Sequence, residues 1–198
     1  KEFCACVNST MEPQDHVIAA NEGASVGLAI GHYIGTGSLP LVYLQNSGLG
    51  NVINPLLSLA SPEVYGIPML LMLGWRGEPG NKDEPQHVHQ GRVMTQLLED
   101  MDVPVVVLSD EIVEAETQTI AAAKLAHEIK GPVAIIVRKN TFDKYAAPKV
   151  EVDLPMGRED AIIVAAETIE DNAAVICTTG MPSRELFEYR VRSGSGHH

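Results

Sequence analysis

The sequence is poor in cysteine, in aromatic residues and in positive charge. Its three cysteines do not form the pattern of a disulfide framework or of a zinc site. Aromatic residues make up only 5% of the chain, so the hydrophobic core must be built from aliphatic side chains. The 14 basic residues against 26 acidic ones give a formal net charge of −12. This charge argues against nucleic acid or an anionic membrane as a partner.

Long hydrophobic runs are also missing. No apolar stretch approaches the ~20 residues that a membrane-spanning helix requires. No basic segment followed by an apolar one opens the chain, so we expect a cytoplasmic protein. Hydrophobic residues still make up 45% of the 198 residues, which suffices for the core of one domain with the start of a second.

Short apolar runs alternate with helix-like segments along the chain. The runs are apolar at every position, which is typical of parallel strands covered on both faces. They predict strands at His16–Ala20, Leu39–Leu44, Pro68–Leu73, Val103–Leu108 and Pro132–Val137. The segments between them predict helices at Glu22–Ile34, Val52–Leu59, Gln86–Asp100 and Asp110–Lys130, the last with Asp110 as N-cap. Right-handed β-α-β connections then make an α/β fold with a doubly wound, mainly parallel sheet and helices on both faces.

The pattern divides the chain into two domains joined by a linker. We expect residues 1–139 to form the first domain without its first strand, since helix-like Lys1–Val7 stands where a β-α unit would precede it. Residues 140–157 carry prolines and mixed charges and are predicted to be the linker. Residues 158–198 begin a new β-α pattern. Its elements are a helix at Arg158–Glu170, a strand at Ala173–Cys177 and a helix at Ser183–Arg190.

Glu22 stands between an apolar run and a helix rich in small residues. It follows the predicted strand His16–Ala20, which would place its carboxylate at the edge where open α/β sheets bind ligands. A carboxylate in that position can perform acid–base chemistry. The alternative interpretation is an ordinary acidic residue in the first turn of a helix, where the helix dipole stabilises it.

A glycine-containing segment, Gln45–Asn51, follows the next predicted strand. It has neither the lysine of a P-loop nor the third glycine of a dinucleotide fingerprint, and Ser47 lacks the preceding glycine of a nucleophile elbow. One interpretation is a loop whose backbone approaches a ligand closely. The other is a tight strand-to-helix turn with capping asparagines.

The polar segment Trp75–His89 follows the third predicted strand. A long polar loop in this place is expected to contact a ligand, and Arg76 suits an anionic group. Asp83, His87 and His89 offer a metal site only if the segment is extended, because residues i and i+2 point apart on a helix. An ordinary solvated loop is the further alternative.

In their order and spacing these motifs resemble the pyrimidine-binding domain of thiamine-diphosphate enzymes. The segments that carry the resemblance are Asn21–Gly23, Thr36–Pro40, Asn46–Asn51 and Ile67–Gly74. Within that superfamily, the segments Gln45–Leu59 and Gly74–Gly80 with Asp83–His87 look most similar to the phosphonopyruvate decarboxylases, with the α chain of sulfopyruvate decarboxylases as the near relative. Thr178–Phe187 resembles the entry to the diphosphate-binding domain of the single-chain decarboxylases, so 158–198 is expected to be the start of that domain.

The resemblance implies the decarboxylation of 3-phosphonopyruvate to phosphonoacetaldehyde and CO2, with thiamine diphosphate and Mg²⁺ as cofactors. It implies that Glu22 is catalytic and hydrogen-bonds the aminopyrimidine ring. The expected cofactor-binding residues are Asn21, Glu22, Ser47, Gly48, Leu49, Gly50 and Asn51. On the substrate side we expect Gln45, Arg76 and Gln86 to bind the substrate and His87 to act in catalysis as a proton shuttle.

One departure from the resemblance concerns the metal. No Gly-Asp dipeptide, with which the family's metal and diphosphate site begins, occurs in this sequence. The metal ligands are therefore expected outside this chain, and the chain alone is expected to be inactive. The resemblance further implies a homo-oligomer that shares its site between subunits and binds a small anionic 2-oxo acid. Two alternatives remain: a sulfopyruvate decarboxylase α subunit, and a non-catalytic domain that binds a ligand or partner.

Overall fold

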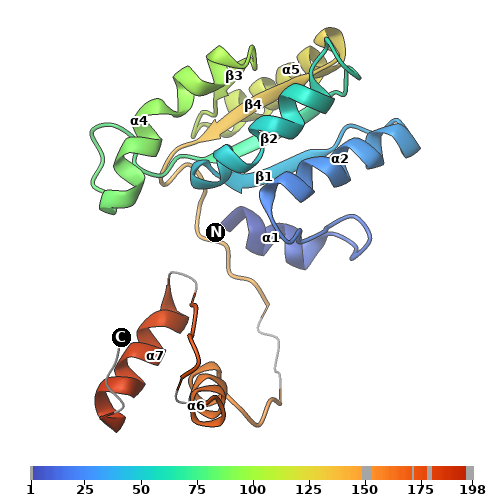
Figure 1. The fold of residues 1–198 in the computed structure, drawn as a ribbon. Coiled ribbons are helices and arrows are strands. Elements are labelled where there is room, and N and C mark those ends of the chain that lie inside the picture. Colours follow the sequence, from blue (N-terminus) through green and yellow to red (C-terminus); the bar gives the residue numbers. More distant parts are fainter. Residues whose placement is uncertain (1, 149–152, 171, 178–179, 195–198) are drawn as a thin grey trace. The chain divides into compact units, whose positions relative to one another are not determined.

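The computed structural model describes residues 2–148, 153–170, 172–177 and 180–194 of the chain (Figure 1). The chain separates into two compact units, Lys1–Ala147 and Pro148–His198, and each is described by itself. The assignment of 1–139, 140–157 and 158–198 as a domain, a linker and a second domain stays a prediction. None of the helices in the described residues is long and apolar enough to cross a membrane.

The first unit alternates strands and helices. Its elements are α1 (Glu2–Thr10), α2 (Glu22–Thr36), β1 (Leu41–Gln45), the 3₁₀ helix η1 (Asn46–Asn51), α3 (Ile53–Pro55), the π-helical turn η2 (Leu56–Ala60), β2 (Met69–Gly74), α4 (Pro85–Asp100), β3 (Val105–Val107), α5 (Ile112–Ile129) and β4 (Pro132–Val137). The predicted strands at Leu39–Leu44, Pro68–Leu73 and Val103–Leu108 are therefore confirmed with shifted ends, and the strand at Pro132–Val137 is confirmed with the predicted bounds.

Within the described residues the sheet has four strands, all parallel, in the order β1-β2-β4-β3. The two central strands, β2 and β4, are buried along almost their whole length. Their uniformly apolar sequences reflect this, because both faces of a central parallel strand are covered by helices. The predicted doubly wound α/β fold is confirmed.

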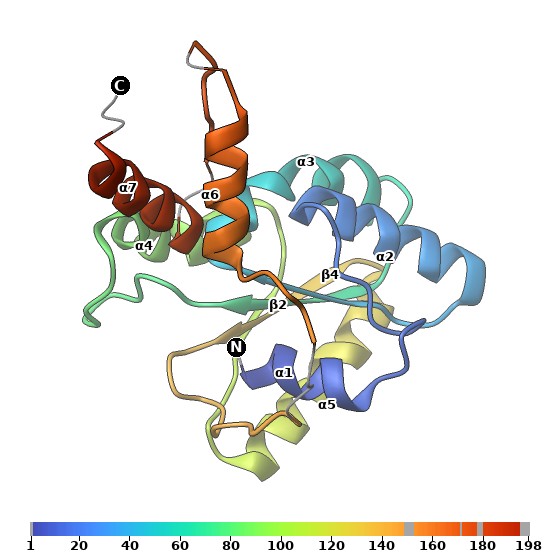
Figure 2. The same ribbon diagram turned by 90° about the horizontal axis from the view of Figure 1, so that it is seen from below.

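Helices cover both faces of the sheet (Figure 2). Leu71, Leu73 and Ile136 point to the face that carries α2, α3 and α4, and the buried Val26 of α2 joins the same core. Neighbouring strand residues point to the opposite face, since successive side chains on a strand alternate. That second core includes Ala122 and Ala126 of α5 together with Leu70, Met72, Val133 and Ile135 of the strands.

The strand predicted at His16–Ala20 is wrong. Residues 16–20 form no strand, and Val17 and Ile18 are 63% and 84% exposed. The strand predicted at Ala173–Cys177 is also wrong, and Ile176 there is 96% exposed. An apolar run becomes a strand only when a neighbouring strand pairs with its backbone, and within the described residues neither run has such a neighbour.

Two predicted helices differ in detail. The residue that flanks the first turn of α5 is Glu111, without a side-chain cap, and the predicted N-cap Asp110 lies one residue earlier. The helix predicted at Val52–Leu59 consists of α3 followed by the wider turn η2.

The second unit contains α6 (Arg158–Thr168) and α7 (Met181–Ser193), which correspond to the helices predicted there. Arg158 donates to both carboxylate oxygens of Glu185 at 2.8 and 2.6 Å. Arg192 donates to Glu159 at 2.6 Å. The first two residues of the segment Thr178–Phe187, and the terminal His197 and His198, lie outside the described residues.

Candidate functional site

The candidate site lies where β1 and β2 end. These strands pair in parallel up to Gln45 opposite Gly74, so the segments that follow them leave the sheet at the same edge. Open α/β sheets bind ligands at this carboxyl edge. The segment after β1 is η1, and the segment after β2 is the polar loop that leads to α4.

Glu22 is the first residue of α2, not the end of a strand. Asn21 forms the N-cap in an extended conformation, and its Oδ1 atom accepts a hydrogen bond from the backbone N–H of Ala24 at 2.8 Å. Such a cap replaces one of the hydrogen bonds that the first turn of a helix lacks. The oxygen of Asn21, a predicted cofactor ligand, is therefore already engaged in fixing where the helix begins.

The Glu22 side chain meets η1 at two points. Asn51 donates from Nδ2 to Glu22 Oε2 at 2.8 Å. The backbone of Gly48 lies so close that a Cβ placed there would be 2.5 Å from Glu22 Oε1. Three predicted cofactor-binding residues thus come together, although they are up to 29 positions apart in the sequence. The carboxylate is half-buried and forms no ion pair with any described residue.

The glycine segment is a 3₁₀ helix and not an open loop. Gly48 and Leu49 are buried, whereas Ser47, Gly50 and Asn51 are exposed. Leu49 is only 2% exposed and packs in the hydrophobic core. Its expected contact with a cofactor, like those of Ser47 and Gly50, stays a prediction. A glycine-containing segment can form either an open loop or a 3₁₀ helix, so the sequence of these residues alone did not distinguish the two.

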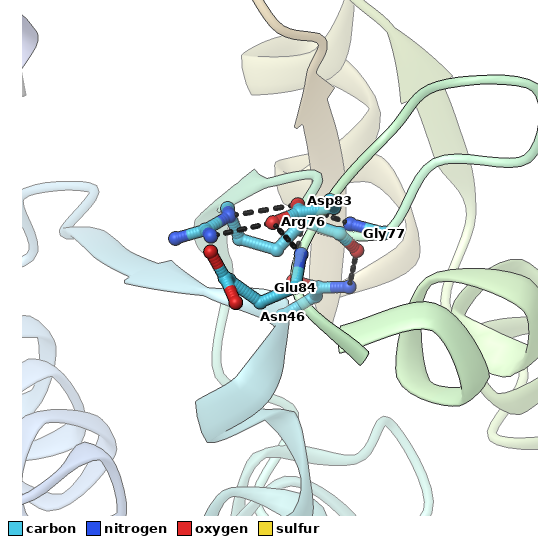
Figure 3. Close-up of polar contacts among 5 residues, drawn as sticks. All are labelled: Asn46, Arg76, Gly77, Asp83 and Glu84. Atoms are coloured by element: carbon cyan, nitrogen blue, oxygen red, sulfur yellow. Dashed lines mark hydrogen bonds and ion pairs between the residues drawn. The ribbon is translucent and has the colours of Figure 1, made fainter. Parts of the chain in front are cut away.

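Asn46, which sequence reasoning did not include among the site residues, joins the two strand ends. Its Nδ2 atom donates to the carbonyl oxygen of Arg76 at 2.8 Å, and its Oδ1 atom accepts from the backbone N–H of Arg76 at 3.0 Å (Figure 3). The residue is 4% exposed. Its only sequence signal is its place, an amide directly after a buried strand.

Arg76 and Asp83 form a two-pronged ion pair in the loop after β2. Arg76 donates from Nε and Nη2 to the two carboxylate oxygens of Asp83 at 2.9 and 2.6 Å. The backbone N–H groups of Gly77 and Glu84 donate to the same carboxylate at 2.7 and 2.8 Å (Figure 3). The hydrogen bond from Arg76 is the main reason why the pKa of Asp83 is far below its usual range, and the two backbone N–H groups add to it.

The loop also packs tightly on α4. Trp75 donates from Nε1 to the carbonyl oxygen of Gly91 at 2.9 Å. A Cβ on Gly91 would overlap the carbonyl group of Gly77 and lie 2.5 Å from the carbonyl oxygen of Arg76. On the other side of the loop, Glu78 pairs with Arg138 just beyond β4 at 2.9 Å. The loop predicted to contact a ligand is therefore anchored at several points.

The remaining predicted residues lie around this loop. His87 is in the first turn of α4, and within the described part of the chain its buried Nδ1 atom has no hydrogen-bond partner. Gln86 and Gln45 are exposed. His89 points its Nδ1 atom to Arg92 Nη2 at 2.8 Å. Among the described residues, no group of three or more His, Cys, Asp or Glu side chains could hold a metal ion.

A separate hollow of about 390 Å³ lies at the carboxyl ends of β3 and β4. None of the predicted site residues lines it. Its walls are residues 107–110, Glu114, Gln118 and residues 138–141.

Comparisons with known proteins identify relatives along most of the chain. No family model matches. The chain is 35% identical over 188 residues to a phosphonopyruvate decarboxylase of Streptomyces viridochromogenes, covering 87% of this chain and 47% of that protein. It is 31% identical over 193 residues to a phosphonopyruvate decarboxylase of Streptomyces hygroscopicus, covering 87% and 46%.

A third relative is the sulfopyruvate decarboxylase subunit alpha of Methanococcus maripaludis. It is 32% identical over 123 residues, which cover 62% of this chain and 70% of that protein. The chain spans about half the length of the two phosphonopyruvate decarboxylases and most of the sulfopyruvate decarboxylase subunit. The resemblance seen in the motifs is confirmed: the chain belongs to the family of phosphonopyruvate and sulfopyruvate decarboxylases.

Proposed function

We propose that this chain supplies part of the active site of an enzyme that decarboxylates 3-phosphonopyruvate to phosphonoacetaldehyde and CO2. The observation that carries the proposal is the extent of similarity to the two phosphonopyruvate decarboxylases. A coverage of 87% of 198 residues is more than the first unit can provide, since that unit ends at Ala147. The match to the sulfopyruvate decarboxylase subunit covers 62% of the chain.

We further propose that the cofactor is thiamine diphosphate. When bound, it supplies an electron sink for the pair of electrons that stays behind when CO2 leaves a 2-oxo acid. The residues present fit its pyrimidine part. Glu22 is a half-buried carboxylate without a cationic partner among the described residues, and it is held by Asn51 at the edge of the sheet where ligands bind.

In this proposal the main residues of the candidate site have the following tasks. The Glu22 carboxylate hydrogen-bonds a ring nitrogen of the aminopyrimidine, and Asn51 and Gly48 set its direction. Arg76 donates hydrogen bonds from its N–H groups to the phosphonate oxygens of the substrate, because a planar guanidinium suits such a group. Gln45 and Gln86 offer exposed amides to the rest of the substrate. His87 moves a proton at one of its ring nitrogens.

The His, Cys, Asp and Glu side chains of the described residues do not form a metal site. The described residues offer no cluster of ligands for Mg²⁺, so any Mg²⁺ that accompanies the diphosphate would be held by residues outside this set. We propose a homo-oligomer in which the site is shared between subunits, and a cytoplasmic location. Among the relatives, the name "subunit alpha" already indicates an assembly of more than one chain.

The test uses the full-length protein with thiamine diphosphate and Mg²⁺. CO2 and aldehyde are followed with phosphonopyruvate and, separately, with sulfopyruvate. Glu22→Gln removes the negative charge of the proposed catalytic residue, and Glu63→Gln is the matched control at an exposed glutamate outside the site. Turnover of phosphonopyruvate that is lost in Glu22→Gln and kept in Glu63→Gln supports the proposal.

Two other outcomes would change it. Turnover of sulfopyruvate alone would mean that the same site acts on sulfopyruvate instead of phosphonopyruvate. Turnover of neither substrate, with no thiamine diphosphate bound, would favour the non-catalytic alternative and overturn the proposed function.

A further inference from the structure

We infer that Asn46 and Asp83 are positioning residues, which hold Arg76 in a fixed orientation so that its remaining N–H groups bind the anionic substituent of the substrate. The inference rests on the proposed function and extends it, because it assigns a task to two residues that do not themselves contact the substrate. Figure 3 shows the residues concerned.

The backbone of Arg76 is fixed by Asn46. The hydrogen-bonded pairing of β1 with β2 ends at Gln45 and Gly74. Beyond that point the side-chain amide of Asn46 pairs with both the N–H and the carbonyl of Arg76, at 3.0 and 2.8 Å. A planar amide has a donor and an acceptor side by side, as a backbone peptide does. Asn46 therefore continues the strand pairing to Arg76, although the chain has already left the sheet.

The guanidinium of Arg76 is fixed by Asp83. Asp83 accepts from Nε and Nη2 at 2.9 and 2.6 Å, so both of its oxygens are engaged by one planar group. The backbone N–H groups of Gly77 and Glu84 hold the carboxylate from the other side, at 2.7 and 2.8 Å. The Asp83 side chain is only 16% exposed. Because the carboxylate has four donors, its position is set by the loop backbone, and it sets the plane of the guanidinium in turn.

One side of the guanidinium stays available. An arginine has five N–H groups, and within the described residues two of its nitrogens, Nε and Nη2, bond to Asp83. Nη1 points away from Asp83 in Figure 3, and the Arg76 side chain is 37% exposed. Holding a long arginine side chain in a single conformation costs side-chain entropy. Since Asp83 already orders Arg76 before any ligand arrives, binding does not have to bear that cost.

The charges around Arg76 also shape what it binds. The negative charge of Asp83 compensates the positive charge of Arg76, and the negative charge of Glu84 acts in the same direction. The attraction for an anion therefore comes from directed N–H donors rather than from net charge. A phosphonate or sulfonate group can turn two of its three oxygens toward such an edge and accept two parallel hydrogen bonds, so it is a class of group that suits this site.

A purely structural role is the competing explanation, in which the Arg76–Asp83 pair only anchors the loop. The same loop contains a second ion pair, between Glu78 and Arg138 at 2.9 Å. Glu78→Gln breaks that pair without touching Arg76, so it is a matched control for the loss of an anchor. A substrate without the anionic substituent, pyruvate, separates binding of that substituent from the rest of the reaction.

The experiment compares Asp83→Asn, Asn46→Ala and Glu78→Gln in the full-length protein. We expect Asp83→Asn to raise KM for phosphonopyruvate by about 10- to 100-fold, the order expected when a well-aligned charge-assisted hydrogen bond is lost. We expect kcat to fall much less and kinetics with pyruvate to stay close to wild type. Asn46→Ala should shift KM in the same direction, and Glu78→Gln should leave it unchanged.

The inference is overturned if Asp83→Asn and Glu78→Gln have the same KM for phosphonopyruvate, or if Asp83→Asn affects pyruvate equally. Should the wild type turn over neither 2-oxo acid, the proposed function fails, and the anion site is tested by binding. Trp75, the single tryptophan, precedes Arg76 and reports on a titration with methylphosphonate through its fluorescence. Saturable binding that Asp83→Asn weakens supports the site, and the absence of binding to the wild type overturns it.

Discussion

The side chain of Glu22 lies against the backbone of Gly48, where a Cβ would be 2.5 Å from Oε1 and 2.6 Å from Cγ and Cδ. An alanine at position 48 would therefore push the carboxylate away and break its hydrogen bond from Asn51. Because the end of a flexible, half-buried side chain can give way, we expect a small effect on the free energy of unfolding. In the full-length protein, however, Gly48→Ala should lose most of the decarboxylase activity.

Gly31 provides the control for this prediction. It lies in α2, outside the predicted site residues, and a Cβ placed there meets nothing within 4 Å. Gly31→Ala should keep its activity and melt at or slightly above the wild-type temperature, because alanine restricts the unfolded chain. Equal activity of the two variants would show that the contact between Gly48 and Glu22 has no part in the reaction.

Asn21 should contribute to stability through its cap on α2. Its Oδ1 atom accepts from the N–H of Ala24 at 2.8 Å, which alanine cannot reproduce. Replacement of a capping residue by alanine costs about 1 kcal/mol, and serine or aspartate retains most of the effect. Urea denaturation of the 198-residue chain should therefore rank Asn21→Ala clearly below Asn21→Asp. Equal stability of the two variants would mean that the cap contributes nothing.

The acid sensitivity of the first unit should depend on Asp83. Arg76 lowers the pKa of Asp83 in the folded state, so its ionised form stabilises the fold. That stabilisation is fully present above the unfolded-state pKa of about 3.9 and disappears as the pH falls through the folded-state value. Denaturation at several pH values should show wild type and Asp83→Asn furthest apart near neutrality and converging in acid. A constant difference between them would exclude this role.

Local sequence patterns predicted the frame of this fold well. The strands at β2 and β4 are apolar throughout because helices cover both faces, and their limits were predicted within one residue. The run at His16–Ala20 is also mostly apolar but has no neighbouring strand among the described residues. Whether a neighbour exists depends on the whole fold, and a short apolar run contains no information about it.

The candidate site shows the same division between local and distant information. Glu22, Arg76 and the η1 segment could be selected from their types and their places after predicted strands. Asn46 and Arg76 are 30 positions apart, and Glu22 and Asn51 are 29 apart. Such pairs are fixed by which strands are neighbours and by how far each extends. The role of Asp83 was also hidden, because its carboxylate suited a metal ligand as well as a partner for arginine.

The packing of α4 against the loop after β2 should depend on Gly91. A Cβ at this position would overlap the Gly77 carbonyl, which is backbone and cannot rotate away. Gly91→Ala must therefore move the helix or the loop, and overpacking of this kind costs about 1 to 3 kcal/mol. Because the same loop holds Arg76, the full-length variant should also bind phosphonopyruvate more weakly.

Gly27 gives the opposite expectation within the same chain. It lies in α2, and a Cβ there meets nothing within 4 Å. Alanine is favoured over glycine inside a helix by roughly 0.5 to 1 kcal/mol, so Gly27→Ala should stabilise the chain against urea. The two helical substitutions are chemically identical, and only their surroundings differ. If Gly91→Ala were as stable as Gly27→Ala, the close approach of α4 to the loop would be absent in solution, and the fixed position of Arg76 would lose its support.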